Sequence, residues 1–401
     1  MKNIKEQIQL IKRGTDEIIE ISELEKKLSK GKALVVKTGF DPSAPDIHLG
    51  HTVLLRKMKH FQQLGHKVFF LIGDFTARIG DPTGRSKLRK QLTKEEVLEN
   101  AKTYEKQIFK VLDKEKTKIV FNSSWCEQLG VEGFFDLTSR YTVARLLERD
   151  DFSKRYKENL PISVVEFLYP LLQGYDSVVM KSDVELGGRD QKFNLLIGRD
   201  LQRSYGVEPQ VIITMPILEG LDGVDKMSKS LNNYIGIDDS HDDMFGKVMS
   251  ISDNLMWRYY ELLTDVDYCS LKEDVKKARV HPKDVKIKLA KTIVSEYYGF
   301  DIAEKSKINF EKVFAKKQNP ENMVEFFLEK ENIVITDLIR EIGFSRSTSE
   351  ARRLVMQNAV SINDKKITDI KKKILLTLEG FILNVGKRKF AKIFKDKKKQ
   401  K

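Results

Sequence analysis

The sequence predicts an α/β protein whose parallel sheet is followed by a helical region and a small α+β unit at the C-terminus. Between residues 32 and 128, runs rich in β-branched and aromatic residues alternate with amphipathic ones, which is the pattern of βαβ units. The length of 401 residues indicates two to three domains at roughly 150 residues each. Hydrophobic residues at 40% and charged residues at 33% exclude intrinsic disorder for most of the chain.

The first part of the chain contains the segments expected to build the sheet. Strands are expected at residues 33–40, 67–75, 117–123 and 210–216. A helix over residues 48–64 would connect the first two strands, because Leu54, Met58 and Phe61 lie on one helical face and Gly65 supplies a C-terminal stop. Strands joined in this way run parallel.

The region after residue 230 is predicted to be mainly helical. A long amphipathic helix is expected over residues 282–298, the polar string at 316–320 is typical of a linker, and a helix near 335–342 precedes a β-rich end. Capping boxes are expected at Thr93 with Glu96, Ser270 with Glu273, and Ser347 with Glu350. We therefore expect three domains, at residues 1–230, 231–320 and 333–398.

The net charge of +13 lies mainly near the C-terminus. Residues 341–401 contain 17 Lys and Arg against 6 Asp and Glu, a net charge of +11. The Lys-rich end at 395–401 is typical of a solvated tail. The basic residues before it are interleaved with apolar ones, which favours an ordered basic face suited to phosphates. These residues are Arg346, Arg352, Arg353, Lys365 and Lys366.

Hydropathy and cysteine content favour a cytoplasmic protein that contacts no membrane. No stretch reaches the roughly 18 apolar residues that a membrane-spanning helix needs, and the first residues lack the apolar region of a signal peptide. Cys126 and Cys269 lie far apart with no CxxC pair. We therefore expect two reduced thiols, with neither a disulfide framework nor a cysteine zinc site.

The first predicted strand leads into GFDPSAPDIHLGH, which places His48 and His51 three residues apart at a helix N-terminus. Both rings would face the same way, and the free N–H groups and helix dipole at this end favour a phosphate. Gly50 would let a ligand approach the backbone closely. By itself, the segment is also compatible with a capped helix that carries two surface histidines.

The second predicted strand leads into GDFTARIGDPTGRSKLR, where Arg85, Lys87 and Arg89 follow the acidic Asp81. The cations would hold a leaving pyrophosphate, and Asp81 would suit the amino group of a small zwitterionic substrate. A Gly-Asp-Pro turn with exposed basic residues is also a common surface loop. This segment is therefore weak evidence when taken alone.

A third segment, LEGLDGVDKMSKS, follows the last predicted strand and carries Lys226 and Lys229 on a loop with Gly220 and Gly223. Two ammonium groups on such a lid would close over a triphosphate and stabilise charge that develops in an in-line displacement. A solvated Lys/Ser loop is the alternative. The His48 helix and this loop constrain each other, because both belong to one α/β domain.

Together, HLGH and KMSKS resemble the paired signatures of class I aminoacyl-tRNA synthetases. The segments GFDPSAPDIHLGH, GDPTGR, YPLLQGYD, GGRDQKFN and KMSKS, in this order and spacing, are similar to those of bacterial tyrosyl-tRNA synthetases. The resemblance covers residues 30–400. It implies a Rossmann-like catalytic domain, a helical domain on the anticodon-stem side, and a C-terminal RNA-binding domain like the one first seen in small ribosomal subunit protein four.

The activity implied by the resemblance is that of a tyrosine–tRNA ligase. Such an enzyme activates tyrosine with ATP to tyrosyl-adenylate and pyrophosphate, and then transfers the tyrosyl group to the 3′ end of tRNA(Tyr). No side-chain nucleophile is required, so catalysis would come from positioning and charge stabilisation. ATP is implied as a substrate that brings Mg²⁺ with it, without a tightly bound cofactor or protein ligands to a metal.

The resemblance also assigns roles to matching residues. The catalytic residues implied are His48, His51, Arg85, Arg89, Lys226 and Lys229. The ATP-binding residues implied are His48, Gly50, His51, Lys226, Met227, Ser228, Lys229 and Ser230. The backbone of tyrosine would be surrounded by Asp81, Tyr169, Gln173 and Gln191, and its phenolic hydroxyl would meet Asp176.

Lys37 departs from the family pattern, because better-known members have a tyrosine there that also contacts the substrate hydroxyl. A lysine at this position can simply end a strand, so we assign it no role. Tyr175 is expected to be a core aromatic residue.

Two alternatives remain at this point. The tryptophan-specific relative shares the fold and signatures but typically lacks the C-terminal RNA-binding domain and the aspartate at position 176. A non-catalytic RNA-binding protein on a synthetase scaffold would fit the localised charge, although intact His48, Asp81 and Lys229 argue against it. The expected partners are tRNA(Tyr), L-tyrosine and ATP, and the family typically forms a homodimer.

Overall fold

The computed structural model describes residues 3–42, 46–81, 92–315, 323–386 and 389–396. The chain divides into two compact units. The first comprises Met1–Ser240 with Lys247–Phe300, and the second comprises His241–Gly246 with Asp301–Lys401. The three-domain division expected from the sequence stays a prediction.

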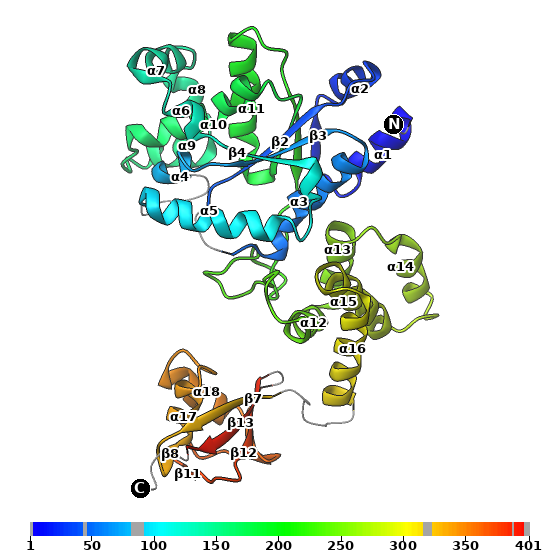
Figure 1. Cartoon of the computed structure of the whole chain (residues 1–401), viewed down its shortest axis with the longest axis vertical. Coiled ribbons are helices and arrows are strands. Elements are labelled where there is room, and N and C mark those ends of the chain that lie inside the picture. The colour runs from blue at the N-terminus through cyan, green and yellow to red at the C-terminus, as the bar shows by residue number, and fades with distance from the viewer. Residues whose placement is uncertain (1–2, 43–45, 82–91, 316–322, 387–388, 397–401) are drawn as a thin grey trace. The chain divides into compact units, whose positions relative to one another are not determined.

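The first unit is built on a six-stranded sheet with the order β1-β6-β5-β2-β3-β4 (Figure 1). The strands from β2 to β6 run parallel, and the short edge strand β1 is antiparallel to β6. The strands are β1 (Glu17–Ile19), β2 (Val35–Phe40), β3 (Lys67–Ile72), β4 (Thr117–Phe121), β5 (Val184–Gly188) and β6 (Val211–Met215). This sheet confirms the predicted α/β class.

Four strands of this sheet were predicted, and two were missed. β2, β3, β4 and β6 lie within the expected ranges. All five residues of β6 are buried, as is typical of parallel strands that are covered on both faces. The missed strand β5 has the sequence VELGG, whose acidic residue and glycines hide its β character.

Helices cover the sheet and connect its strands. α3 packs against β2, β3 and β5, whereas α11 packs against β5 and β6 and contacts α10. The helices up to β6 are α1 (Ile4–Lys12), α2 (Ile21–Ser29), α3 (Leu49–Gln63), α4 (Thr76–Ile79), α5 (Lys94–Ile108), α6 (Ser123–Cys126), α7 (Gly130–Ser139), α8 (Val143–Leu146), α9 (Asp150–Lys157), α10 (Val164–Met180) and α11 (Lys192–Ser204), with short 3-10 turns at Lys114–Lys116 and Arg189–Gln191.

Five further helices follow the sheet. They are α12 (His241–Met249), α13 (Asp253–Leu263), α14 (Tyr268–Lys276), α15 (Pro282–Tyr298) and α16 (Phe300–Ala315). The bounds of α15 confirm the helix predicted at 282–298. No helix in the described ranges is long and apolar enough to cross a membrane.

The predicted helix starts are confirmed in part. The Thr93–Glu96 capping box is present, with both of its hydrogen bonds. The Ser270–Glu273 box is wrong, because α14 begins at Tyr268 and the Asp267 carboxylate accepts from the Cys269 N–H. Asp267, three residues upstream of Ser270, therefore caps the helix, because an aspartate carboxylate is a favourable N-cap acceptor.

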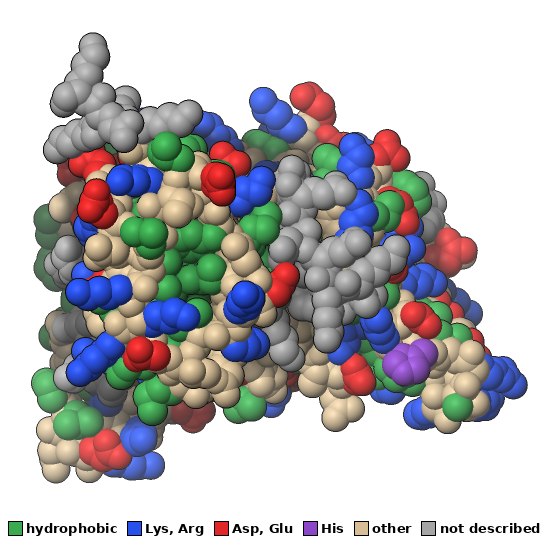
Figure 2. Space-filling model, turned by 90° about the horizontal axis from the view of Figure 1, so that it is seen from below, with side chains coloured by type: hydrophobic (Ala, Val, Ile, Leu, Met, Phe, Trp, Pro, Cys, Tyr) green, Lys and Arg blue, Asp and Glu red, His purple; other side chains and the backbone are tan. Residues whose placement is uncertain are grey.

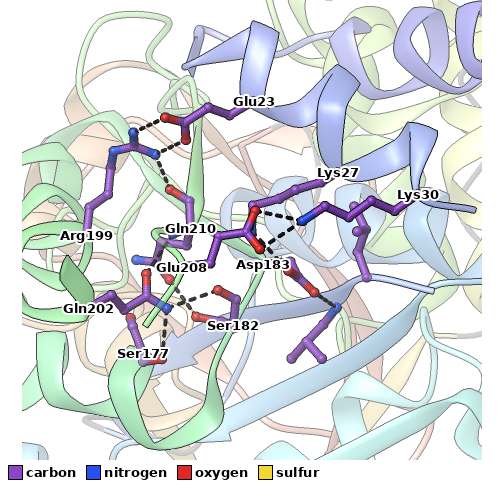
Figure 3. A network of polar contacts seen from close by, with 12 residues as sticks. Glu23, Lys27, Lys30, Ser177, Ser182, Asp183, Arg199, Gln202, Glu208 and Gln210 are labelled. Carbon is purple, nitrogen blue, oxygen red and sulfur yellow. Dashed lines mark hydrogen bonds and ion pairs between the residues drawn. The ribbon is translucent and has the colours of Figure 1, made fainter. Parts of the chain in front are cut away.

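A polar network ties the N-terminal helix α2 to the sheet and to α11 (Figure 3). Arg199 on α11 makes two hydrogen bonds to Glu23 on α2, at 2.7 and 2.8 Å. Asp183 accepts from the Val35 N–H at 2.9 Å and from Lys27 at 3.1 Å. The buried Arg199 and Lys27 thus have partners, as burial requires, and the network fixes the edge of the sheet at which β2 and β5 begin.

The end of the second unit is a small α+β fold. Its five-stranded sheet has the order β10-β9-β12-β13-β7, and β8 pairs with β11 separately. The elements are β7 (Val324–Leu328), β8 (Asn332–Val334), α17 (Ile335–Glu341), α18 (Thr348–Met356), β9 (Val360–Ile362), β10 (Lys365–Lys366), β11 (Lys373–Leu375), β12 (Phe381–Val385) and β13 (Lys389–Lys395). A core of its own, including Leu338, Val355 and Ile393, holds these elements together.

This part of the chain agrees with most sequence expectations. α17 confirms the helix predicted near residues 335–342. Ser347 caps α18 as predicted, since its hydroxyl accepts from the Glu350 N–H, but the Glu350 carboxylate accepts from the Arg346 N–H instead. The linker predicted at 316–320 lies outside the described residues.

Candidate active site

A cavity of about 770 Å³ in the first unit brings together most of the predicted site residues. Its walls include the last residues of β2, β5 and β6, so it lies at the carboxyl edge of the parallel sheet, where ligands of such folds bind. The predicted residues that line it are His48, Gly50, His51, Asp81, Tyr169, Gln173, Gln191, Lys226, Met227, Ser228, Lys229 and Ser230. Arg85 and Arg89 lie outside the described residues, and Asp176 is not a lining residue.

The rings of the two histidines lie in contact, tilted by 32°, at the start of α3. His48 is the N-cap residue, and the centroids of the two rings are 3.9 Å apart. The His48 N–H donates to His51 Nδ1 at 3.2 Å. Among the described residues, the buried His48 Nδ1 has no hydrogen-bond partner. The His48 residue itself lines the cavity.

Both rings are neutral at physiological pH. Burial lowers the pKa of His48 to about 2, and the charges of His51, Lys229 and Lys226 act in the same direction. Burial likewise lowers the pKa of His51 to about 4, together with the charges of Lys229 and Lys226. The histidines therefore offer hydrogen bonds, while positive charge in the described part of the site comes from the lysines.

Backbone pairing holds the histidine segment against the chain that follows the lysine loop. The Leu49 N–H donates to the Ile235 carbonyl at 2.9 Å, and the Ile237 N–H donates to the Ile47 carbonyl at 3.2 Å. The side chains of all four residues are buried. This short antiparallel contact keeps residues 46–51 beside residues 226–230.

Gly50 lies where these two segments meet. Its N–H points at the Met227 sulfur at 3.3 Å. A Cβ at this position would lie 3.0 Å from the His48 ring and 3.5 Å from the Met227 Cβ. The missing side chain therefore permits the close approach of helix and loop.

The lysine loop is hydrogen-bonded to itself and reaches over the cavity. The Met227 N–H donates to the Leu218 carbonyl at 2.9 Å, and the Ser228 N–H donates to Asn233 Oδ1 at 2.8 Å. Ser228 and Ser230 share a hydroxyl contact of 2.7 Å. The extent of the lid motion expected from the sequence stays a prediction.

Each lysine is paired with a carboxylate that sequence reasoning missed. Lys229 pairs with Asp46, and Lys226 Nζ lies 3.8 Å from Asp190. Asp46 and Asp190 are partly exposed, so these pairs are weak. A polyphosphate can replace such carboxylates as the partner of both ammonium groups. Asp46 lies in the segment GFDPSAPDIHLGH, and its acidic character there was a usable signal.

The residues expected around an amino acid are hydrogen-bonded in two groups that line the same cavity. Gln191 Nε2 donates to Asp81 Oδ2 at 2.8 Å, and the Tyr169 hydroxyl donates to Asp41 at 2.9 Å. Asn194 donates to Gln173 at 3.0 Å and to Gln191 at 3.1 Å. Asp41 and Asn194 were not predicted, although both lie inside the quoted motifs. The two groups offer both acceptors and donors to a zwitterion.

Asp176 is buried beside these two groups, with 2% of its surface exposed. Its carboxylate accepts from Trp125 Nε1 at 2.8 Å and from Asn122 Nδ2 at 3.5 Å. Burial raises the pKa of Asp176 to about 7, although the charge of Lys37 and the Trp125 hydrogen bond oppose this. Tyr175 is partly buried and packs against an apolar cluster, with its ring centroid 5.9 Å from that of Tyr205, so it lies at the margin of the core.

The predicted RNA-binding residues are exposed on the small α+β fold. They are Arg346, Arg352, Arg353, Lys365 and Lys366. The interleaved Val355 and Val360 are fully buried beneath them, as expected for an ordered basic face. In the view of Figure 2, Lys and Arg side chains alternate with hydrophobic and acidic ones.

Within the described ranges, no group of three or more His, Cys, Asp or Glu side chains is close enough to hold a metal ion. Cys126 is buried and Cys269 is exposed, and the two thiols are not joined to each other.

The depressed pKa values predict a titration that is unusual for histidine. In an NMR titration, the His48 and His51 signals should stay constant from pH 8 to pH 5.5, because both rings remain neutral. Below about pH 6.5, His51 binds a proton in the unfolded chain but stays neutral in the folded protein. The free energy of unfolding should therefore fall, by about 1.4 kcal/mol per pH unit for this ring, until pH 4.

The variants His48→Gln and His51→Gln would assign the two signals. The unfolded protein in urea serves as the reference for an unperturbed histidine. A titration midpoint near 6.5 for either folded ring would contradict the electrostatic description of the site.

Known proteins that are similar to this chain show its family. The model of the tRNA synthetases class I (W and Y) matches residues 29–315, and that of the tyrosine–tRNA ligase SYY-like C-terminal domain matches residues 315–393. The chain is 54% identical to the tyrosine–tRNA ligase of Aquifex aeolicus, over 97% of this chain and 98% of the relative. It is 52% identical to that of Geobacter sulfurreducens, over 98% and 99%.

Solved structures agree in fold. A tyrosyl-tRNA synthetase from Archaeoglobus fulgidus, complexed with L-tyrosine, superposes with a TM-score of 0.62 at 26% identity, covering 76% of this chain and all of that one. A C-terminally truncated mitochondrial tyrosyl-tRNA synthetase of Aspergillus nidulans gives a TM-score of 0.65 at 21% identity, over 78% and 95%. From its sequence matches, the chain belongs to the class I tRNA synthetases of the W and Y group, within the tyrosine–tRNA ligases.

Proposed function

We propose that the cavity binds ATP and L-tyrosine together and converts them to tyrosyl-adenylate and pyrophosphate. The tyrosyl group then passes to the 3′-terminal ribose of tRNA(Tyr). The observation that carries this proposal is that His48, His51, Lys226 and Lys229 line the same cavity as Asp81, Tyr169, Gln173 and Gln191. A nucleotide site and an amino acid site therefore share one space.

The reaction needs positioning more than covalent participation by the protein. The tyrosine carboxylate oxygen attacks the α-phosphorus of ATP, a P–O bond forms, and the bond to pyrophosphate breaks. Lys226 and Lys229 would stabilise the charge that grows on the phosphates, and the neutral His48 and His51 would donate hydrogen bonds. Arg85 and Arg89 are proposed to assist pyrophosphate departure. Mg²⁺ enters with ATP as part of the substrate.

The amino acid end of the cavity suits tyrosine. The Asp81 carboxylate would accept from the ammonium group, while Tyr169, Gln173 and Gln191 would hold the rest of the backbone. Asp176 would accept from the phenolic hydroxyl, and this requires its ionised form. An aspartate at this position is what the tryptophan-specific relative typically lacks, so Asp176 favours tyrosine over that alternative.

The partners are proposed from surface chemistry. The exposed Arg346, Arg352, Arg353, Lys365 and Lys366 would contact phosphates of tRNA(Tyr). A homodimer is supported by the exposed apolar side chains of Val131, Phe135 and Val143 on α7 and α8, because exposed apolar patches mark interaction sites. The reaction is placed in the cytoplasm, where its three substrates meet.

The proposed function is tested by ATP–pyrophosphate exchange with single amino acids. We expect exchange with tyrosine and none with tryptophan. Exchange with tryptophan alone would support the tryptophan-specific alternative, and no exchange with any amino acid would support a non-catalytic RNA-binding protein.

Lys229 provides a sharper test of the catalytic description. Because its ammonium is proposed to act on transition-state charge, Lys229→Ala should slow adenylate formation by roughly 10²-fold. The Kd for tyrosine should change by less than about twofold. Lys26→Ala serves as the control, since Lys26 is an exposed residue of α2 outside the cavity. An equal loss in rate and in tyrosine affinity would count against this role.

We predict that adenylate formation and tRNA charging can be separated by removing the C-terminal part of the chain. A chain that ends at residue 315 should still form tyrosyl-adenylate, because every residue that lines the cavity precedes this point. It should charge tRNA poorly, since the exposed basic residues are gone. tRNA binding by the full chain should weaken steeply as salt rises. Full-rate charging by the shortened chain would refute the RNA-binding role.

A further inference from the structure

The buried side-chain amide of Asn194 contacts two residues that line the cavity. Asn194 is 2% exposed and is not itself a lining residue, whereas Gln173 and Gln191 are. Asn194 Nδ2 donates to Gln173 Oε1 at 3.0 Å and to Gln191 Oε1 at 3.1 Å. An amide NH2 group has two N–H donors, so both of them are used to hold the carbonyl oxygens of the two glutamines.

Arg149 determines which way the Asn194 amide points. Arg149 Nη1 donates to Asn194 Oδ1 at 3.4 Å, and a guanidinium has N–H donors but no acceptor. The asparagine therefore turns its carbonyl oxygen towards Arg149 and its NH2 group towards the glutamines. Arg149 is itself buried and held in place. It donates to the Asp151 carboxylate at 2.6 and 2.8 Å, and its guanidinium carbon lies 3.8 Å from the centroid of the Phe152 ring.

The orientation of Asn194 fixes the orientation of both glutamine amides. Because each Oε1 faces Asn194, the NH2 group of each glutamine is left for another acceptor. Gln191 Nε2 donates to Asp81 Oδ2 at 2.8 Å. Gln173 Nε2 has no hydrogen-bond partner among the described residues, and Gln173 lines the cavity. A series of donors that begins at Arg149 therefore ends at Asp81 and at the cavity.

We propose that Arg149 and Asn194 are positioning residues for amino acid activation. They fix the direction in which the amides of Gln173 and Gln191 donate, and they touch no substrate themselves. If Asn194 were reversed, Gln191 would turn its carbonyl oxygen towards the Asp81 carboxylate. Both groups only accept hydrogen bonds, so they would repel each other. The observed order of donors keeps Asp81 in place as an acceptor for the ammonium group of the amino acid.

This inference rests on the proposed function and is tested by ATP–pyrophosphate exchange with tyrosine, for the full chain and for Asn194→Asp. The substitution keeps the size of the side chain. The new carboxylate can accept from Arg149 and from both glutamines, so the variant should fold with both glutamine amides reversed. We expect KM for tyrosine to rise at least about tenfold, while kcat and KM for ATP change by less than about threefold. A general distortion of the shared cavity would raise both KM values.

Gln202→Glu is the matched control. Gln202 lies on the same helix as Asn194, is fully buried and does not line the cavity. Its Nε2 donates to the Ser177 and Ser182 carbonyls at 3.0 Å each. Its Oε1 accepts from the Gln210 N–H at 2.7 Å. This amide therefore also donates twice and accepts once, and the same change in it should leave KM for tyrosine within about twofold.

Arg149 provides a second pair of variants, which keeps the test valid if Asn194→Asp does not fold. Arg149→Met removes the donor that orients Asn194, so KM for tyrosine should rise at least about fivefold. Arg149→Lys keeps a cation that only donates hydrogen bonds, so KM should stay within about twofold of that of the unaltered chain.

Each outcome decides between the two claims. A rise in KM for tyrosine alone supports both of them. If Asn194→Asp leaves KM for tyrosine unchanged, or raises both KM values equally, the positioning role is overturned and the proposed function stays intact. If the unaltered chain shows no exchange with tyrosine, the proposed function fails and the inference fails with it.

Discussion

The short backbone pairing of residues 47–49 with residues 235–237 is the constraint on which the site depends. It joins the start of α3 to the chain just after the lysine loop, and the alternating side chains of Ile47, Leu49, Ile235 and Ile237 anchor it in the core. This pairing holds together two segments that are about 180 residues apart in sequence, so that both line one cavity. Each segment alone has the sequence of an ordinary surface element. Their side chains can act on one ligand only because the two segments lie side by side.

Burial determines which residues of the site carry a charge and which offer only hydrogen bonds. His48 and His51 lose their charge because they are desolvated beside two lysines, so they supply directional hydrogen bonds. Lys226 and Lys229 are paired with partly exposed carboxylates. Because such exposed ion pairs are weak, a polyphosphate can replace the carboxylates at a low cost in free energy. Near the cavity, the buried Asp176 accepts hydrogen bonds from Trp125 and Asn122, and the buried Lys37 is paired with Glu185.

Local patterns predicted much of the fold. Four strands, α3, α15 and the Thr93 cap followed from hydrophobic periodicity and capping chemistry within short windows. β5 was missed because VELGG owes its place to neighbours on both sides rather than to propensity. The Ser270 cap was wrong because Asp267, three residues earlier, is the stronger competitor for the same N–H groups.

The site could be predicted only as far as its residues lie in recognisable segments. The family resemblance pointed to His48, Asp81, Tyr169 and Lys229, and the structure brings all of them to one cavity. Asp46 and Asp190 lie in the quoted motifs, but the lysine with which each one pairs depends on which loops meet in the fold. Lys37 could not be interpreted from sequence, because Glu185 lies 148 residues away and becomes its neighbour only through the pairing of β2 with β5.

A crystal structure with a non-hydrolysable tyrosyl-adenylate analogue tests the shared cavity most directly. We expect the phosphate mimic to lie between the His48–His51 pair and Lys229, with the amino acid portion extending past Asp81 and Gln191 towards Asp176. An analogue that binds away from either motif, or with its phosphate mimic in contact with neither, would contradict the claim that both segments act on one nucleotide.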